Sequence, residues 1–272
     1  MRLKFMVPLL LPLLLAPPAR GGFERWETGA RPAALSNAYV AVADDPWALS
    51  FNPAGLAGLS TTSIALCFSP QPFGVSELST SAAAAVFPTT IGTIGAGLRR
   101  HGFALYRETS ISLAFARDAR GIKLGICLTY LAVAIKGYGS AASAGLDAAL
   151  LVPLGDGWRW GACFKNVNAP RIGSAGERVP QCITTGIAYL PDSSFMIALE
   201  LRKDSHFPLS PRLGFEYRPV AAFALRGGWS ELSREISAGV GMRWGALEVD
   251  YAFLSHPQLG GTHVGSITMA MR

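Results

Sequence analysis

The sequence predicts an all-β protein, a transmembrane antiparallel β-barrel of about 14 strands that encloses a short N-terminal helical plug. Three observations lead to this prediction. From about Ser63 onward, runs of roughly ten residues alternate apolar with small or polar side chains, which is the two-residue period of a strand. Shorter and longer connections alternate along the chain, as in even-stranded outer-membrane barrels. Finally, 50% of the residues are apolar and only 15% are charged, which is a low charged fraction for a soluble protein.

The chain divides into three segments, and the first has the features of a secretory signal. Arg2 and Lys4 precede the apolar run 5–16, which is too short to span a membrane comfortably. Cleavage is expected between Ala19 and Gly22. No later apolar run approaches the roughly 20 residues that a spanning helix needs, so the chain can cross a membrane only as a barrel. The predicted segments are a signal peptide at 1–21, a hatch at 22–61 and a transmembrane barrel at 62–272.

Each predicted strand has one apolar face and one small, polar or charged face. In the run 234–244, Ile236 and Val240 lie on one face while Ser237 and Arg243 lie on the other. The short turns and both termini are expected on the periplasmic rim, and the longer connections on the extracellular rim. The predicted strands span 62–70, 78–88, 91–100, 109–118, 122–135, 143–153, 158–167, 181–190, 195–203, 210–218, 222–230, 234–244, 247–255 and 262–272.

Alternation alone does not say which face meets water, so an exported soluble β-sandwich or barrel is the alternative. The signal peptide, the unequal rims and the large apolar side chains on nearly every run favour the membrane barrel, and hence the bacterial outer membrane as its location. Its lipid would then be one partner of the protein. Aromatic residues near the ends of the runs could form interface girdles: Tyr130, Trp158, Tyr189, Tyr217, Trp229 and Trp244.

The stretch "ADDPWALSFNPAGLAGL" (43–59) contains two helix starts that end almost at once. Asp45 and Asn52 are suited to N-cap positions, and each precedes a proline suited to a first helical position, while Gly55 and Gly58 shorten the second turn. These residues could be ordinary caps only, or Asn52 and the paired aspartates could also bind arginines of the barrel lumen. The candidate hatch motif comprises Asp44, Asp45, Pro46, Asn52, Pro53, Ala54 and Gly55.

The segment 30–59 resembles the N-terminal signature of the outer-membrane superfamily that contains FadL-type long-chain fatty-acid transporters and PorV/PorQ-type proteins. The similarity rests on Ala30-Arg31, "AYVAVADD" at 38–45 and "NPAGLA" at 52–57. The resemblance implies that this segment folds inside the barrel as a hatch. Fatty-acid transporters of the superfamily are much longer and have large extracellular loops, whereas this barrel has only about 210 residues. The compact loops favour the shorter PorV/PorQ-like branch, some of whose members serve type IX protein secretion.

Charged side chains recur on the faces opposite the apolar ones and are therefore expected to point into the lumen. They could form an interlocked network that stabilises the barrel and anchors the hatch, or they could line a path for a solute. The predicted lumen-facing charges are Arg159, Lys165, Glu200, Arg202, Arg212, Glu216, Arg218, Arg226, Arg243, Glu248 and Asp250, together with Arg99, Lys123 and Asp147.

The sequence carries no motif of an enzyme, a nucleotide-binding site or a thiol redox centre, and no catalysis, cofactor or metal is expected. Without Arg2 and Lys4 the charge balance is 22 basic against 18 acidic residues, too weak to indicate nucleic-acid binding. The four histidines map to the predicted extracellular rim, where a surface metal site is the alternative to solvated side chains. The four cysteines fall on the lumen face, and a disulfide between Cys163 and Cys182 is conceivable if their hairpin is symmetric.

Two functions agree with a plugged outer-membrane barrel of this kind. The first is transport, or binding, of a small hydrophobic solute through a plugged barrel, by rearrangement of the hatch or through a lateral gap. The alternative is a non-transporting PorV/PorQ-like barrel that binds a protein partner in type IX secretion or in surface attachment. The hatch signature is common to both.

Overall fold

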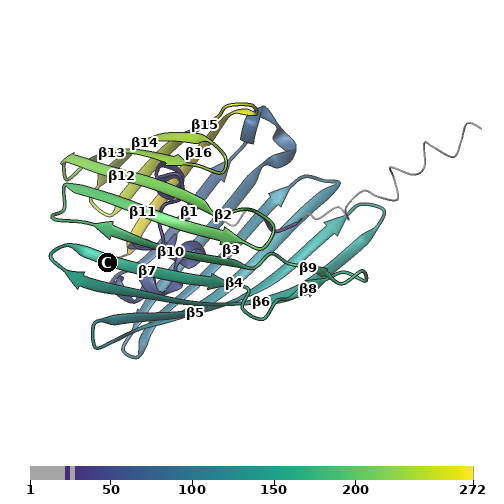
Figure 1. Ribbon diagram of the computed structural model, residues 1–272, viewed down its shortest axis with the longest axis horizontal. Helices are drawn as coiled ribbons and strands as arrows, with labels where there is room; N and C mark the ends of the chain where they lie inside the picture. Colours follow the sequence, from purple (N-terminus) through teal and green to yellow (C-terminus); the bar gives the residue numbers. More distant parts are fainter. Residues whose placement is uncertain (1–21, 25–27, 272) are drawn as a thin grey trace, which may run out of the picture.

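The protein is a closed barrel of antiparallel strands, and the fourteen strands of its wall confirm the predicted fold class (Figure 1). The computed structural model describes residues 22–24 and 28–271, so the predicted signal peptide lies outside the described residues. Strands adjacent in the chain are adjacent in the wall, except that β7 pairs with β10 and β1 closes the barrel against β16. The wall strands are β1 (Thr62–Ser69), β2 (Thr80–Thr89), β3 (Gly92–Gly102), β4 (Tyr106–Ala119), β5 (Ile122–Ile135), β6 (Gly139–Gly155), β7 (Trp158–Lys165), β10 (Cys182–Tyr189), β11 (Phe195–Asp204), β12 (Ser210–Val220), β13 (Phe223–Ser230), β14 (Glu235–Trp244), β15 (Leu247–His256) and β16 (Gly260–Met271).

The apolar faces of the strands point outward. On β14, Ile236 is 64% exposed on the outer surface, whereas Ser237 is buried in the interior. Large apolar side chains are exposed in the same way on strand after strand, among them Leu66, Leu113 and Ile126. An outer surface of this composition suits hydrocarbon and not water, which contradicts the soluble alternative and identifies a membrane-type barrel.

The two rims differ as predicted. Turns such as 120–121 and 156–157 define the short-turn rim, and segments such as 70–79 and 166–181 define the opposite, long-loop rim. Within the described residues, no helix is long and apolar enough to cross a membrane.

Two connections of the long-loop rim are shorter than predicted. The sequence places loops at about 101–108 and 136–142, but strand pairing continues to Gly102 opposite Arg107 and to Ile135 opposite Gly139. Backbone hydrogen bonds extend the ladder there, while the outward face no longer needs apolar side chains. The alternating pattern therefore ends before the strands do.

The connection between β7 and β10 contains a small hairpin that the sequence pattern does not reveal. Its strands are β8 (Arg171–Ile172) and β9 (Glu177–Arg178), too short for a periodic signal. The pairing of β7 with β10 places Cys163 opposite Thr184, and Cys182 opposite Lys165. The assumption of a symmetric hairpin was wrong by two positions. All four cysteines are buried free thiols, so the conceivable disulfide is not formed.

Residues 28–61 lie inside the barrel, and we call them the hatch (Figure 1). Its helical elements are α2 (Ala30–Ala34), α3 (Ala48–Phe51) and η1 (Pro53–Gly58), while η2 (Pro72–Gly74) and η3 (Ser76–Leu78) lie in the loop after β1. Helix α2 packs on β13 to β16, and η1 packs on β3 to β6. The hatch therefore bridges opposite sides of the lumen, which fourteen strands leave too wide for wall side chains alone to fill.

Candidate functional site

Of the two predicted helix starts, the one at Asn52 has its side-chain cap and the one at Asp45 does not. The Asn52 side-chain oxygen accepts a hydrogen bond from the Ala54 backbone N–H at 3.1 Å, with Pro53 at the first position of η1. An Asp45 carboxylate oxygen accepts from the Trp47 N–H at 2.8 Å, but this bond lies in the turn before α3, which begins at Ala48 without a side-chain cap. Gly55 does not end the second turn but lies within η1, where a Cβ atom would collide with the Ala43 carbonyl oxygen. The close approach of two hatch segments is the physical reason for glycine at that position.

The hatch also touches the wall at glycines that face the lumen. A Cβ atom on Gly161 of β7 would collide with the Val40 carbonyl group, and one on Gly125 of β5 would collide with the Ala54 backbone nitrogen. Similar close contacts with hatch atoms occur at Gly95, Gly97, Gly214, Gly228 and Gly239. We call these seven residues the wall glycines. They let the hatch backbone approach the wall on several sides of the barrel.

Wall side chains bind the hatch backbone between these contacts. The Glu200 carboxylate accepts hydrogen bonds from the N–H groups of Tyr39 and Val40, at 2.9 and 2.8 Å. Ser237 of β14 accepts from the Ser36 N–H at 3.0 Å. The Asn52 amide donates to two backbone carbonyls, one on Val40 of the hatch and one on Leu150 of β6. The hatch is thus held by hydrogen bonds as well as by packing.

An ionic cluster around Arg31 joins the hatch to the wall on the side of the short-turn rim. The Arg31 guanidinium lies 2.6 Å from an oxygen of Asp44, 3.3 Å from Asp45 and 2.8 Å from Glu216 on β12. It also donates to the Tyr39 hydroxyl, which in turn donates to Asp45 at 2.6 Å. Arg31 is buried, so its partners supply the polar environment that water would otherwise provide.

Burial and charge shift the acid–base properties of this cluster. Burial raises the pKa of Asp45 to about 6, against the attraction of Arg31. Burial opposes the charge of Arg31, but Asp44 and Glu216 outweigh it and hold the pKa of Arg31 well above its usual value. Arg31 is therefore permanently charged, whereas Asp45 changes its charge in mildly acidic solution.

The predicted lumen charges fall into two groups. Near the short-turn rim, Arg226 pairs with Glu216, Glu248 and Asp250, and Arg218 and Arg243 extend this network. Nearer the long-loop rim lie Lys165 beside Asp147, Arg202 beside Asp204, and Arg212 beside Glu200. Arg159 contacts no wall carboxylate of either group but lies 3.8 Å from Asp44 of the hatch cluster. The pairing of Asp44 and Asp45 with Arg31 of the hatch itself was not predicted from the sequence. Arg31 is an arginine among small hatch residues, and this could have indicated the pairing.

A cavity of about 450 Å³ lies between the hatch and the wall on the side of the long-loop rim. Helix α2 and the residues flanking it form its floor, with Thr28, Ala33 and Asn37 in the lining. Apolar wall and loop residues such as Phe207 and Leu254 provide much of the rest. Its volume matches the size of cavities that hold small organic ligands.

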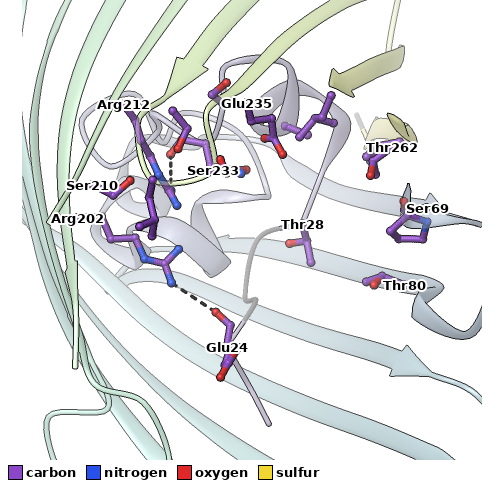
Figure 2. A pocket seen from close by; sticks show the side chains of 18 of the residues that line it. Glu24, Thr28, Ser69, Thr80, Arg202, Ser210, Arg212, Ser233, Glu235 and Thr262 are labelled. Atoms are coloured by element: carbon purple, nitrogen blue, oxygen red, sulfur yellow. Dashed lines mark hydrogen bonds between the residues drawn. The ribbon is translucent and has the colours of Figure 1, made fainter. Parts of the chain in front are cut away.

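Polar side chains line this cavity on both sides, and its arginines lie mainly on one of them. Figure 2 shows Arg202, Ser210 and Arg212 together on one wall, with Ser69 and Thr80 across the space. The Ser210 hydroxyl is buried and has no hydrogen-bond partner among the described atoms. A buried hydroxyl of this kind can bind a polar atom of a ligand. Asp204 and Ser210 belong to this wall and were not among the predicted site residues.

In the part of the chain that the structure describes, no group of three or more His, Cys, Asp or Glu side chains could hold a metal ion. His101, His206, His256 and His263 lie near the long-loop rim as predicted, but in separate places. The cavity is therefore the candidate site.

A closed fourteen-strand wall, an apolar outer surface and a plugged lumen define a bacterial outer-membrane β-barrel with the architecture of FadL-type transporters. Comparison with solved structures gives the toluene transporter TbuX of Ralstonia pickettii, with a TM-score of 0.69 and 12% identity over 92% of this chain and 100% of that one. The monoaromatic hydrocarbon channel CymD has the same TM-score and identity, over 92% of this chain and 99% of that one. A Pseudomonas aeruginosa FadL homologue has a TM-score of 0.60 and 12% identity, over 92% and 99% of the two chains.

At 12% identity these similarities establish the fold. No family model and no curated protein matches the sequence. The similar structures are transporters or channels and not enzymes. None of the three is a PorV/PorQ-type protein, so that branch, with its secretion partner, stays a prediction that rests on the sequence alone.

Proposed function

We propose that the protein transports small hydrophobic solutes across the outer membrane, and that the cavity above the hatch is where a solute first binds. The main support for this proposal is the cavity itself, which lies on the side of the long-loop rim and has a mixed apolar and polar lining. The fold similarity to a toluene transporter and to a monoaromatic hydrocarbon channel supports the same solute class. In this proposal the long-loop rim faces the exterior, and the first 21 residues are the export signal.

The charged residues below the hatch have an anchoring role in this proposal. Arg31 of the hatch and Arg226 of β13 are buried and both pair with the buried Glu216, and Arg226 also pairs with the buried Asp250 on β15. Such a network stabilises one arrangement of hatch and wall and does not form an open aqueous path. A solute must then pass either by a rearrangement of the hatch or through the wall.

The test is uptake of labelled toluene and a labelled fatty acid by cells whose outer membrane contains the protein, compared with cells that lack it. We expect faster uptake of at least one of them, with unchanged uptake of a polar sugar. Single-channel conductance should stay at background, because the lumen is plugged. Equal uptake in both strains would contradict the transport function.

A further inference from the structure

The residues just after the predicted signal are held at the long-loop rim, away from the helices of the hatch. Phe23 is 1% exposed and packs in a separate apolar cluster with Leu131 of β5, Ile172 of β8 and Val179. A large side chain enclosed in this way fixes the position of the chain around it.

A buried carboxylate lies beside the same backbone. Glu108 of β4 is 5% exposed, and one of its oxygens accepts hydrogen bonds from the Phe23 N–H at 2.9 Å and from the Tyr106 hydroxyl at 2.8 Å. Its other oxygen lies 3.6 Å from the Arg99 guanidinium. A methyl group placed on Gly22 would lie 3.5 Å from the Tyr106 hydroxyl oxygen and 3.9 Å from the Glu108 carboxylate. The backbone of Gly22 is thus itself close to both groups.

The sequence offers one suitable cleavage bond next to this site. Signal peptidases require small residues at the first and third positions before the bond that they cut. Between Ala19 and Phe23, the Gly21–Gly22 bond meets this requirement, with Gly21 directly before it and Ala19 two residues earlier. The neighbouring bonds fail because Arg20 or a proline occupies one of the two positions.

We propose that the signal is removed between Gly21 and Gly22, and that the new amino terminus binds in a site formed by Glu108 and Tyr106. Hydrolysis adds one water across the bond and leaves a carboxylate on Gly21 and an amine on Gly22. This amine takes up a proton at neutral pH, because an α-amino group has a pKa of about 7.7–8.0. The ammonium then donates to Glu108, a mode of terminal capture in which a buried charge gains a charged partner.

Capture of the amino terminus would also position Glu24 in the lining of the cavity. Glu24 follows Phe23 directly and lines the cavity, and its backbone carbonyl accepts from Arg202 at 3.5 Å (Figure 2). The captured terminus therefore fixes one part of the cavity lining. The inference rests on the proposed export of the chain to the outer membrane.

The test begins with the mass of the intact protein purified from outer membranes, followed by labelling of its α-amine at neutral pH. We expect the amino terminus at Gly22. One additional ion pair that raises the pKa of the amine by one unit slows its labelling about tenfold. Glu108→Gln should therefore increase the labelling rate about tenfold, and Tyr106→Phe should increase it less. Glu231→Gln, on an exposed loop residue of the same rim, should leave the rate unchanged.

The outcomes separate this inference from the proposed function. An amino terminus at any other residue overturns the inference, whatever the uptake assay shows. A terminus at Gly22 whose labelling rate is the same in the Glu108→Gln and Glu231→Gln variants overturns the capture, because burial alone would protect both. If Glu108→Gln does not reach the membrane, the labelling rate of the Tyr106→Phe variant is the test. A rate equal to that of Glu231→Gln then overturns the capture.

Discussion

Arg31 shows how one side chain can organise the hatch. It contacts Asp44, Asp45 and Tyr39 within the hatch and Glu216 on the wall, while almost none of its surface reaches water. Glu216 in turn binds Arg226 of β13, so the hatch cluster and the wall network share one carboxylate. The favourable energy of such a cluster depends on every charge having its partner.

Replacement of Arg31 by methionine should therefore leave buried carboxylates without their cation. We expect the free energy of unfolding to fall by about 3–5 kcal/mol, the range for breaking a buried ion pair from one side. Urea unfolding of the protein in detergent or lipid would measure it. Arg117→Met is the matched control, because Arg117 is exposed at the end of β4, and it should change stability by less than about 0.5 kcal/mol. Equal effects of the two substitutions would show that the cluster does not hold the hatch.

The raised pKa of Asp45 predicts that the stability of the protein depends on pH. Its pKa in the folded protein is raised to about 6, above the 3.8 of the free side chain, so the folded state binds the proton more tightly. The stability that this group contributes is full below pH 3.8 and is lost as the pH rises through 6. The difference between the folded and unfolded pKa values corresponds to a loss of about 3 kcal/mol in the free energy of unfolding over this pH range.

Asp45→Asn should remove this dependence. We expect the difference in unfolding free energy between the wild type and the variant to move in favour of the variant as the pH rises from 4 to 7. Groups outside this cluster titrate equally in both proteins, so the difference reports on Asp45 and the residues in contact with it. A difference that is constant over this pH range, or that moves in the opposite direction, would contradict the raised pKa.

At the scale of elements, the wall glycines explain how strands and hatch fit together. Each removes a Cβ atom where the hatch meets a strand, and at Gly125 and Gly161 the hatch atom in contact belongs to the backbone. In sequence these residues only alternate with apolar ones, as any small lumen residue would. Alternation predicts which face they occupy, but the contact depends on the path of the hatch, which no strand pattern contains.

A methyl group at such a contact should displace the hatch. For Gly161→Ala we expect a loss of about 1–3 kcal/mol, as for overpacking in a core, and faster hydrogen exchange at the backbone amides of 38–43. Gly265→Ala, on the outer face of β16 with no atom within 4 Å of the added carbon, should leave both quantities nearly unchanged. Slow hydrogen exchange at the backbone amides of 38–43 in the Gly161→Ala protein would contradict a tight contact between Gly161 and the hatch.

The elements differ in how far the sequence could predict them. Long strands such as β5 follow from alternation, because their outer side chains meet lipid and their inner ones do not. The cap at Asn52 follows from local chemistry, whereas the expected cap at Asp45 is not formed, because α3 begins one residue after Trp47. The hairpin β8–β9 and the register of Cys163 do not, because a connection of that length can fold back in several ways. The cavity could not be predicted either, since its lining combines residues from the two ends of the chain.

At the scale of the whole molecule, the protein is a plugged barrel with one face of the plug in an ionic network and the other under a ligand-sized cavity. The network lies towards the short-turn rim and the cavity towards the long-loop rim. In the proposed transport function, this polarity places the binding site on the side of entry and the closed lumen below it.

The most direct test of this account is to fill the cavity and measure uptake. Val264 lines it from β16, while Ile267 on the same strand points outward and is 48% exposed. Val264→Trp should reduce uptake of labelled toluene or fatty acid about tenfold, the effect of losing about 1.4 kcal/mol of binding. Ile267→Trp should leave it unchanged, provided that both proteins reach the outer membrane in equal amounts. Undiminished uptake by the Val264→Trp protein would contradict the claim that solutes pass through this cavity.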